Sequence, residues 1–213
     1  MMTTCEKPSL LIRNGTVVTA SETTQADVYI VGETIEAIGN HLQFPADRVI
    51  DATGKYLFPG AVDAHTHMEL PFMGTFSSDS FESGTLAALH GGTTTIIDFA
   101  MQPRGGSLND GLNRWHQKAD GHAVCDYAFH LGVTDFNPTT QAEIAAIVRE
   151  RGVTSFKVFM AYKGALMVDD AQIAELMAET GRYGAMVIAH TENGDWIERN
   201  VTQLKAEGKT EPR

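Results

Sequence analysis

Short apolar runs separated by turn residues characterise the first part of the chain. Asn14-Gly15 stands between Leu10–Ile12 and Thr16–Thr19, and an Asn-Gly pair in such a place is typical of a two-residue hairpin. Further strands are predicted at 27–31, 34–38 and 48–51. So few short strands bury little core by themselves. We therefore expect residues 1–57 to form part of a β-sandwich that needs partners elsewhere.

After residue 58 the pattern changes, because apolar runs alternate with segments whose apolar residues recur every three or four positions. This alternation predicts a parallel sheet with helices, either a barrel or a doubly wound layer. The predicted strands lie near residues 62, 96, 128, 157 and 187, and the predicted helices span 79–90, 108–118, 141–151, 169–183 and 196–209. A closed barrel of this class has eight strands. Five strands lead us to expect the N-terminal portion of a longer chain.

Two local patterns refine the second half of the chain. Thr140 and Glu143 have the spacing of a capping box, which predicts that a helix begins at Gln141. The run 185–189 is almost entirely apolar, as in a parallel strand that is covered on both faces.

Two histidines, His65 and His67, lie in the first strand predicted after residue 58. Side chains two residues apart in a strand point to the same face, so both imidazoles and Asp63 share one side. Three polar groups that converge at a strand end contribute little to packing. The pair therefore predicts a metal site, and the alternative is that these are ordinary polar residues at a strand end.

Two further polar residues end later strands of the same series. Lys157 has apolar neighbours in sequence, and such a lysine snorkels, has a lowered pKa, or finds a partner. A neutral amine also reacts with carbon dioxide to give a carbamate, whose two oxygens can bridge cations. His190 follows an apolar run, at the end of a strand where parallel α/β folds bind ligands. His130 is interpreted as a hydrogen-bonded core histidine.

Charge and composition narrow the class of partner. The 27 acidic residues outnumber the 16 basic ones, and the net charge is −11. This balance disfavours nucleic acid and anionic membranes as partners and favours small neutral substrates. No apolar run approaches the roughly 20 residues of a membrane span, and the first residues lack a secretory signal. Cys5 and Cys125 predict neither a disulfide framework nor a cysteine-rich zinc site, so we expect a cytoplasmic, reduced protein.

Four motifs that occur together in this order resemble those of the dihydropyrimidinases and hydantoinases, which are cyclic amidohydrolases of the metal-dependent amidohydrolase superfamily. The motifs are Asp63–Thr75, Gly91–Phe99, Ser155–Gly164 and His190–Asn193. The resemblance begins at Asn14-Gly15 and so covers nearly the whole chain. It implies an α/β fold in which residues 58–213 form the N-terminal part of a (β/α)8 TIM-like barrel, with about five strands present, beside a small β-sandwich.

The resemblance also implies a site with two divalent metal ions, of which zinc is the expected kind. His65 and His67 hold the first ion, a carbamylated Lys157 bridges it to the second, and His190 binds the second. Tyr162 is implied to donate a hydrogen bond to the substrate carbonyl and to its oxyanion. Family members use another histidine and an aspartate on later strands, so we expect residues 1–213 to be inactive alone.

The loop from Glu69 to Asp79 resembles the lid that covers the exocyclic group of the substrate in this family. Its apolar residues Leu70, Phe72 and Met73 are expected to line that pocket. Phe159 is expected to contribute from the strand that carries the lysine.

The implied activity is metal-dependent hydrolysis of the cyclic amide bond of dihydropyrimidines (dihydrouracil, dihydrothymine) or 5-substituted hydantoins, which yields N-carbamoyl amino acids in pyrimidine catabolism. A homotetramer of the full-length protein is implied as well. Allantoinase and dihydroorotase are alternatives, but Met68 stands where dihydroorotases carry an arginine, which favours an uncharged ring. A catalytically dead scaffold protein is a further alternative, although every ligand that this span could hold is present.

Overall fold

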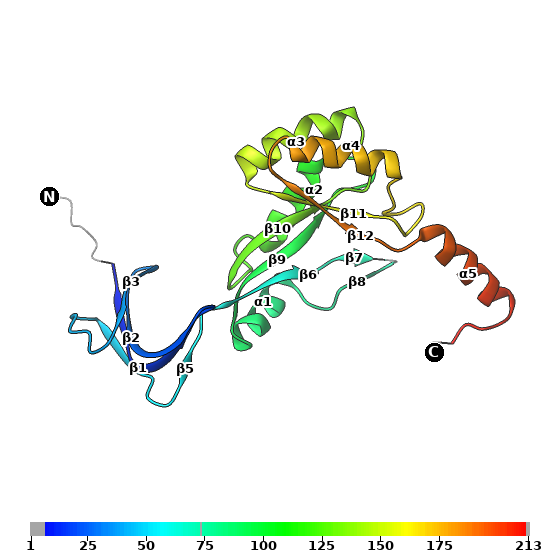
Figure 1. Cartoon of the computed structure of the whole chain (residues 1–213). Helices are drawn as coiled ribbons and strands as arrows, with labels where there is room; N and C mark the ends of the chain where they lie inside the picture. The colour runs from blue at the N-terminus through cyan, green and yellow to red at the C-terminus, as the bar shows by residue number, and fades with distance from the viewer. Residues whose placement is uncertain (1–6, 73, 212–213) are drawn as a thin grey trace. The chain divides into compact units, whose positions relative to one another are not determined.

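The computed structural model describes residues 7–72 and 74–211 (Figure 1). The chain divides into two compact units, Met1–Gly60 and Ala61–Arg213. The predictions for Cys5 and Met73 concern residues outside the described ranges, whereas Cys125 is a free, half-buried thiol. Among the described residues, no helix has the length and apolar character that crossing a bilayer requires.

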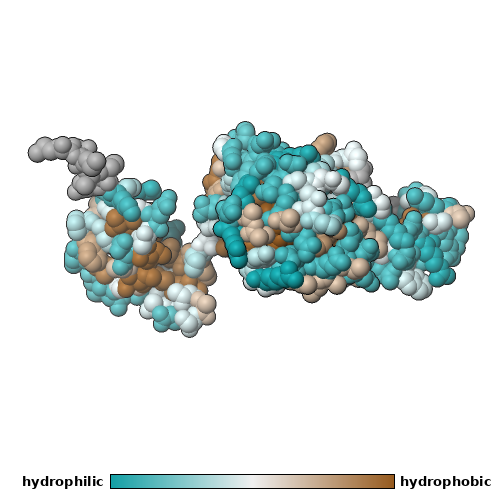
Figure 2. All heavy atoms as spheres, turned by 90° about the horizontal axis from the view of Figure 1, so that it is seen from above, coloured by the Kyte–Doolittle hydropathy of each residue, from teal (hydrophilic) through white to brown (hydrophobic). Residues whose placement is uncertain are grey.

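The first unit is a five-stranded sheet in the order β3-β2-β1-β4, with β5 also paired to β1. Its strands are β1 Ser9–Val18, β2 Thr23–Val31, β3 Thr34–Gly39, β4 Arg48–Asp51 and β5 Tyr56–Leu57. β2 runs antiparallel to β1 and β3, whereas β4 and β5 run parallel to β1. The buried cluster of this unit consists of Val17, Ala26 and Val28. Apolar residues gather on the face of this unit seen in Figure 2, in keeping with the small size of its core.

The predicted hairpin at Asn14-Gly15 is wrong, because β1 continues through this pair. The pairing of β1 with β2 shifts register between Ile12 and Gly15, which marks a β-bulge. Asn14 has φ 60°, a left-handed conformation that asparagine tolerates, and its N–H donates to Asp27 Oδ1 at 2.9 Å. The left-handed conformation of Asn14 therefore forms a bulge within one long strand. The chain reverses its direction at residues 19–22 instead.

The second unit is built on a parallel sheet with the strand order β12-β11-β10-β9-β6 (Figure 1). The strands are β6 Ala61–Thr66, β9 Thr93–Met101, β10 Asp126–Gly132, β11 Ser155–Phe159 and β12 Met186–His190. These confirm the five predicted strands. Their spatial order follows the chain without the reversal of a doubly wound sheet, which is the arrangement of a barrel.

Helices follow the strands of the second unit as the periodicity predicts. They are α1 Phe81–His90, α2 Leu108–Ala119, α3 Pro138–Arg151, α4 Asp170–Gly181 and α5 Gly194–Ala206. Between β6 and α1 lies a short antiparallel hairpin, β7 Pro71–Phe72 and β8 Thr75–Phe76. α1 and α2 contact β9, and α4 contacts β12.

The core of the second unit lies between this sheet and its helices. The largest completely buried side chains there include Trp115, Phe81, Phe156, Ile96 and Leu176. The prediction that the 185–189 run is covered on both faces is wrong, because Met186 is 63% exposed. β12 is an edge strand of the described sheet, and an edge strand lacks the neighbour that would cover it.

The predicted start of the helix at Gln141 is also wrong, since α3 begins at Pro138. Asn137 is the N-cap, and its side chain accepts hydrogen bonds from the N–H groups of Thr139 and Thr140. Proline is well suited to the first helical position, because its missing N–H would have no partner there. Thr140 completes a capping box with Asn137, because its Oγ1 accepts a hydrogen bond from the N–H of Asn137 at 2.8 Å.

Glu143 does not form the predicted capping box. Its side chain instead connects α3 to the start of α2. Its carboxylate accepts hydrogen bonds from Ser107 Oγ at 2.6 Å, Leu108 N at 2.7 Å and Asn109 Nδ2 at 3.1 Å. A carboxylate at a helix N-terminus accepts hydrogen bonds from free N–H groups and interacts favourably with the positive end of the helix dipole.

We expect Glu143→Ala to lower the free energy of unfolding by about 1.5–3 kcal/mol, since it removes hydrogen bonds to a charged group. Chemical denaturation measures this change. Glu150→Ala, at an exposed position of the same helix, is the control and should stay within about 0.5 kcal/mol of the unaltered protein. Equal effects of the two substitutions would contradict the role assigned to Glu143.

Candidate active site

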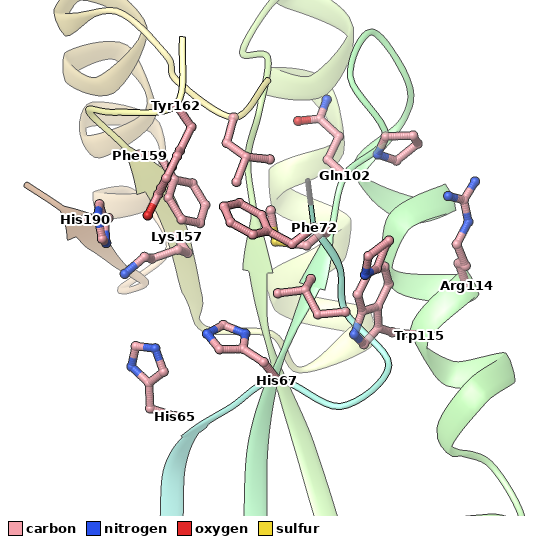
Figure 3. A pocket seen from close by; sticks show the side chains of 15 residues that line it. His65, His67, Phe72, Gln102, Arg114, Trp115, Lys157, Phe159, Tyr162 and His190 are labelled. Carbon is pink, nitrogen blue, oxygen red and sulfur yellow. The ribbon is translucent and has the colours of Figure 1, made fainter. Parts of the chain in front are cut away.

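A cavity of about 510 Å³ opens at the carboxyl ends of the strands of the second unit (Figure 3). Eight of the residues proposed from sequence line it: His65, His67, Leu70, Phe72, Lys157, Phe159, Tyr162 and His190. Asp63, expected on the same face as the two histidines, is exposed and does not line the cavity. They come from β6, β11, β12 and the connecting segments, including the β7–β8 hairpin. The fold thus brings together residues up to 125 positions apart in the chain (190 − 65).

The two histidines of the first motif enter the cavity side by side. His65 lies near the end of β6 and His67 just beyond it. Their ring centroids are 5.2 Å apart, and the ring planes are nearly perpendicular at 83°. The ring of Phe99 lies beneath both, at 4.6 Å from His65 and 4.9 Å from His67. This aromatic support limits the rotation of both imidazoles.

The surroundings of the two histidines favour their neutral form. Partial desolvation lowers the pKa of His65, and the nearby Lys157 lowers it further. Burial likewise lowers the pKa of His67, with smaller effects from His65 and Lys157. A neutral imidazole has the free nitrogen lone pair that metal binding requires.

Lys157 is buried in β11, with 6% of its surface exposed. Its Nζ lies 5.6 Å from the ring centroid of Phe99 and 5.5 Å from that of Phe159. Within the described residues, no carboxylate oxygen lies within 4 Å of this amine. Burial lowers the pKa of Lys157, so the neutral amine is more accessible than in water. The alternative of a lysine that snorkels to solvent is excluded.

His190 ends β12 on the same side of the cavity. Its Nε2 is buried and makes no hydrogen bond, although Glu192 Oε2 lies 2.8 Å away in an unsuitable direction. The ring lies near those of Tyr162 and Phe159, tilted by 36° to each, with centroid separations of 5.4 and 5.8 Å. A buried nitrogen without a hydrogen bond is costly, and a metal ion at this position would satisfy it.

Tyr162 has φ 64°, which is an uncommon conformation for a bulky residue. Its carbonyl accepts hydrogen bonds from the N–H groups of Ala165, Leu166 and Met167 at 3.0, 3.0 and 3.3 Å. The tight turn therefore holds the tyrosine in a strained backbone conformation. Its ring also contacts Phe72 edge to face at 5.2 Å. Strain of this kind is often found at functional sites.

Several residues of the cavity wall were missed from sequence, among them Gln102, Arg114, Trp115 and Leu166. Gln102 follows the end of β9, so the strand-end rule that found His190 could have found it too. Its side chain donates to Gly106 O at 2.8 Å and to Asp135 O at 3.0 Å. These bonds tie the loop after β9 to the loop after β10.

His130 is a structural residue, as predicted. It is 8% exposed and lies within hydrogen-bond reach of Ser155 Oγ and of Ala64 O, the latter at 3.0 Å. Both ring nitrogens are therefore occupied.

The donor set of the cavity suits a metal only in part. In the described ranges, no three His, Cys, Asp or Glu side chains converge closely enough to hold an ion. His65, His67 and His190 share the cavity with Lys157. An unmodified lysine offers a metal ion only an amine and no anionic oxygen. The set fits a divalent ion if the lysine carries an anionic oxygen, because imidazole and carboxylate-type ligands suit zinc.

Comparison with known proteins gives consistent matches. The model of the amidohydrolase family matches residues 56–212. D-hydantoinase of Streptomyces coelicolor is 49% identical over 208 residues, which cover 95% of this chain and 44% of that protein. Dihydropyrimidinase of Rattus norvegicus is 42% identical over 208 residues, with coverages of 95% and 40%.

Solved structures agree with these sequence matches. The crystal structure of dihydropyrimidinase from Brevibacillus agri matches with a TM-score of 0.94 and 50% identity, over 96% of this chain and 44% of that one. The chain therefore spans less than half the length of each of these three relatives.

We expect Lys157→Met to stabilise the metal-free protein by about 1–3 kcal/mol, because it removes a buried polar group without a charged partner. The folded pKa of Lys157 is lowered from 10.5. The loss of folding stability caused by burying the charged lysine is therefore fully present below the folded pKa, and it disappears as the pH rises through 10.5. Denaturant titrations at pH 7 and pH 10.5 measure this.

The control for this measurement is Lys205→Met, which replaces an exposed lysine in the last turn of α5. It should change the free energy of unfolding by no more than about 0.5 kcal/mol at either pH. A destabilising Lys157→Met substitution at pH 7 would show that the buried amine is held by favourable contacts.

Proposed function

The chain belongs to the amidohydrolase family, and on that basis we propose that it forms part of an enzyme that hydrolyses cyclic amide bonds. The observation that carries this proposal is the convergence of His65, His67, Lys157, Tyr162 and His190 on one cavity. The proposed substrates are dihydropyrimidines, such as dihydrouracil and dihydrothymine, or 5-substituted hydantoins. The products are N-carbamoyl amino acids. The names of the relatives, D-hydantoinase and dihydropyrimidinase, support this substrate class.

We propose that the site binds two divalent ions, preferably zinc. His65 and His67 would hold one ion, His190 the other, and a carbamylated Lys157 both. The lowered pKa values of His65, His67 and Lys157 support this arrangement, as does the Nε2 of His190, which makes no hydrogen bond. When bound, such ions supply Lewis-acid activation of water and of the amide carbonyl.

Carbamylation of Lys157 uses the properties of its buried amine. The neutral nitrogen would attack the carbon of carbon dioxide: an N–C bond forms, one C–O π bond opens with its electron pair moving to oxygen, and one N–H proton is released to water. The product carries one negative charge on two oxygens. Burial favours this reaction by lowering the pKa of the amine, since only the unprotonated form is nucleophilic.

The other residues of the cavity orient the substrate. The hydroxyl of Tyr162 would donate a hydrogen bond to the carbonyl oxygen as negative charge develops on it. Leu70, Phe72 and Phe159 supply an apolar wall for the ring substituent and exclude water. Met68 packs beside Gly84 in the core and brings no charge to the cavity. The apolar wall favours a small cyclic ureide over a nucleic acid.

The remaining features of the protein are proposed from the family resemblance. We propose a cytoplasmic homotetramer that acts in pyrimidine catabolism. The Met1–Gly60 unit would form part of a β-sandwich, and its small buried cluster of Val17, Ala26 and Val28 supports the need for further strands. The scaffold alternative is disfavoured, because the four proposed metal ligands all face one cavity.

The first test is ring opening by the protein purified at its natural length from its natural source. We expect hydrolysis of dihydrouracil or hydantoin that is lost on chelation and restored by zinc. Lys157→Ala should lower kcat/KM by a factor of more than about 100, because it removes a proposed ligand of both ions, and even outer partners of metal ligands are worth about 10–100-fold. Lys205→Ala, at an exposed site, is the matched control. Residues 1–213 alone should be inactive.

Allantoin and dihydroorotate, supplied to the same preparation, test the alternative enzymes. A preparation that binds metal but prefers either compound would replace the proposed substrate class. A natural-length protein without metal or activity would favour the scaffold.

Tyr162→Phe tests the proposed oxyanion contact. We expect kcat to fall by a factor of about 100–1000, the effect of removing one oxyanion donor, with metal content unchanged. Steady-state kinetics and metal analysis measure both quantities. Tyr183→Phe removes a hydroxyl outside the cavity lining and should leave kcat unchanged. A Tyr162→Phe enzyme with normal kcat would exclude the proposed role.

A further inference from the structure

Asp98 is a completely buried carboxylate in β9 that no part of the proposed mechanism uses. Its Oδ2 accepts hydrogen bonds from Thr66 Oγ1 at 2.9 Å and from Met68 N at 2.7 Å. Its Oδ1 accepts from Phe99 N at 2.8 Å and from Trp115 Nε1 at 3.2 Å. Four donors thus occupy both oxygens, which is the hydrogen-bond pattern of an ionised carboxylate.

The two donors to Oδ2 belong to the residues on either side of His67. They therefore fix the backbone at this histidine from both directions. The pairing of β6 with β9 shifts register between Asp63 and Thr66, and Thr66↔Asp98 is its last pair. Beyond this point the side chain of Asp98 replaces the regular backbone ladder, so the position of His67 depends on one carboxylate.

The two donors to Oδ1 connect the same carboxylate to the rest of the cavity. Phe99 carries the ring that supports both imidazoles. Trp115 is 1% exposed and lines the cavity wall. Asp98 therefore contacts the histidine segment, the residue that carries the aromatic support, and the wall.

We propose that Asp98 is a positioning residue that holds His67, and through Phe99 also His65, in the geometry needed to bind a divalent cation. This inference rests on the proposed metal site. Outer hydrogen bonds that orient metal ligands are worth about 10–100-fold in metal affinity. A purely structural role would instead change stability and leave the affinity of the folded protein unaltered.

The experiment measures Zn²⁺ affinity by chelator competition and the visible absorption of the Co²⁺-substituted protein, both at the natural length of the chain. Asp98→Asn replaces an acceptor oxygen with an N–H2 group that faces donors. We expect about 10–100-fold weaker Zn²⁺ binding and an altered Co²⁺ spectrum, which reports ligand geometry. Thr66→Val removes one donor to Asp98 and keeps the side-chain shape, and should change both readouts in the same direction by less.

The matched control is Glu179→Gln. Glu179 is also a buried carboxylate, 6% exposed, and accepts hydrogen bonds from Gln141 and Arg182 outside the cavity. This variant should keep the Zn²⁺ affinity within about twofold and leave the Co²⁺ spectrum unchanged. Equal losses in Glu179→Gln and Asp98→Asn would assign the effect to general stability and overturn the inference.

The remaining outcomes separate this inference from the proposed function. Normal Zn²⁺ affinity and a normal Co²⁺ spectrum in Asp98→Asn overturn the inference and leave the metal site intact. If Asp98→Asn does not fold, Thr66→Val decides between the same two results. A protein that binds no Zn²⁺ before any substitution overturns the proposed metal site, and the positioning role with it.

Discussion

Parallel pairing of β6, β9, β10, β11 and β12 is the constraint on which the site depends. It directs the carboxyl ends of all five strands to one edge, where polar side chains face a common cavity. The register of the strands brings residues at neighbouring strand ends next to one another: Phe159 pairs with His190, and Thr66 pairs with Asp98. Residues from opposite ends of the second unit therefore meet without long loops. An antiparallel sheet would send alternate strand ends to opposite edges.

The chemistry of the site follows from the apolar rings around its nitrogen atoms. The ring of Phe99 lies beneath His65 and His67, and the amine of Lys157 lies over rings of Phe99 and Phe159. These apolar surroundings disfavour protonation and make the same nitrogen atoms available for binding and reaction. A buried lysine without an anionic partner costs stability, and sites that need such groups commonly trade stability for activity.

The described sheet has β6 and β12 at its two edges. Val62 and Met186, on these strands, are 60% and 63% exposed. The site residues nevertheless lie inside a formed cavity, because the loops after β9 and β11 are held by their own hydrogen bonds. Arg104 Nη1 donates to Ala165 O at 3.0 Å and so joins these two loops. The part of the cavity described here therefore depends on contacts within this unit.

Sequence alone determined the order of the parallel strands and helices of the second unit and the proposed ligands His65, His67, Lys157 and His190. These follow from local information: apolar periodicity, turn residues, and polar residues at the ends of apolar runs. The roles of these four residues in metal binding were implied by the family resemblance, and these roles remain predictions.

Tertiary structure alone decided the bulge at Asn14, the partners of Glu143 and the contacts of Asp98. Each depends on hydrogen bonds between residues far apart in the chain, such as Thr66 to Asp98 and Leu108 to Glu143. A local pattern shows that a residue can cap, turn or ligate, but not which distant group satisfies it. That choice is made only when the strands and helices pack, because a buried polar group must then find a partner.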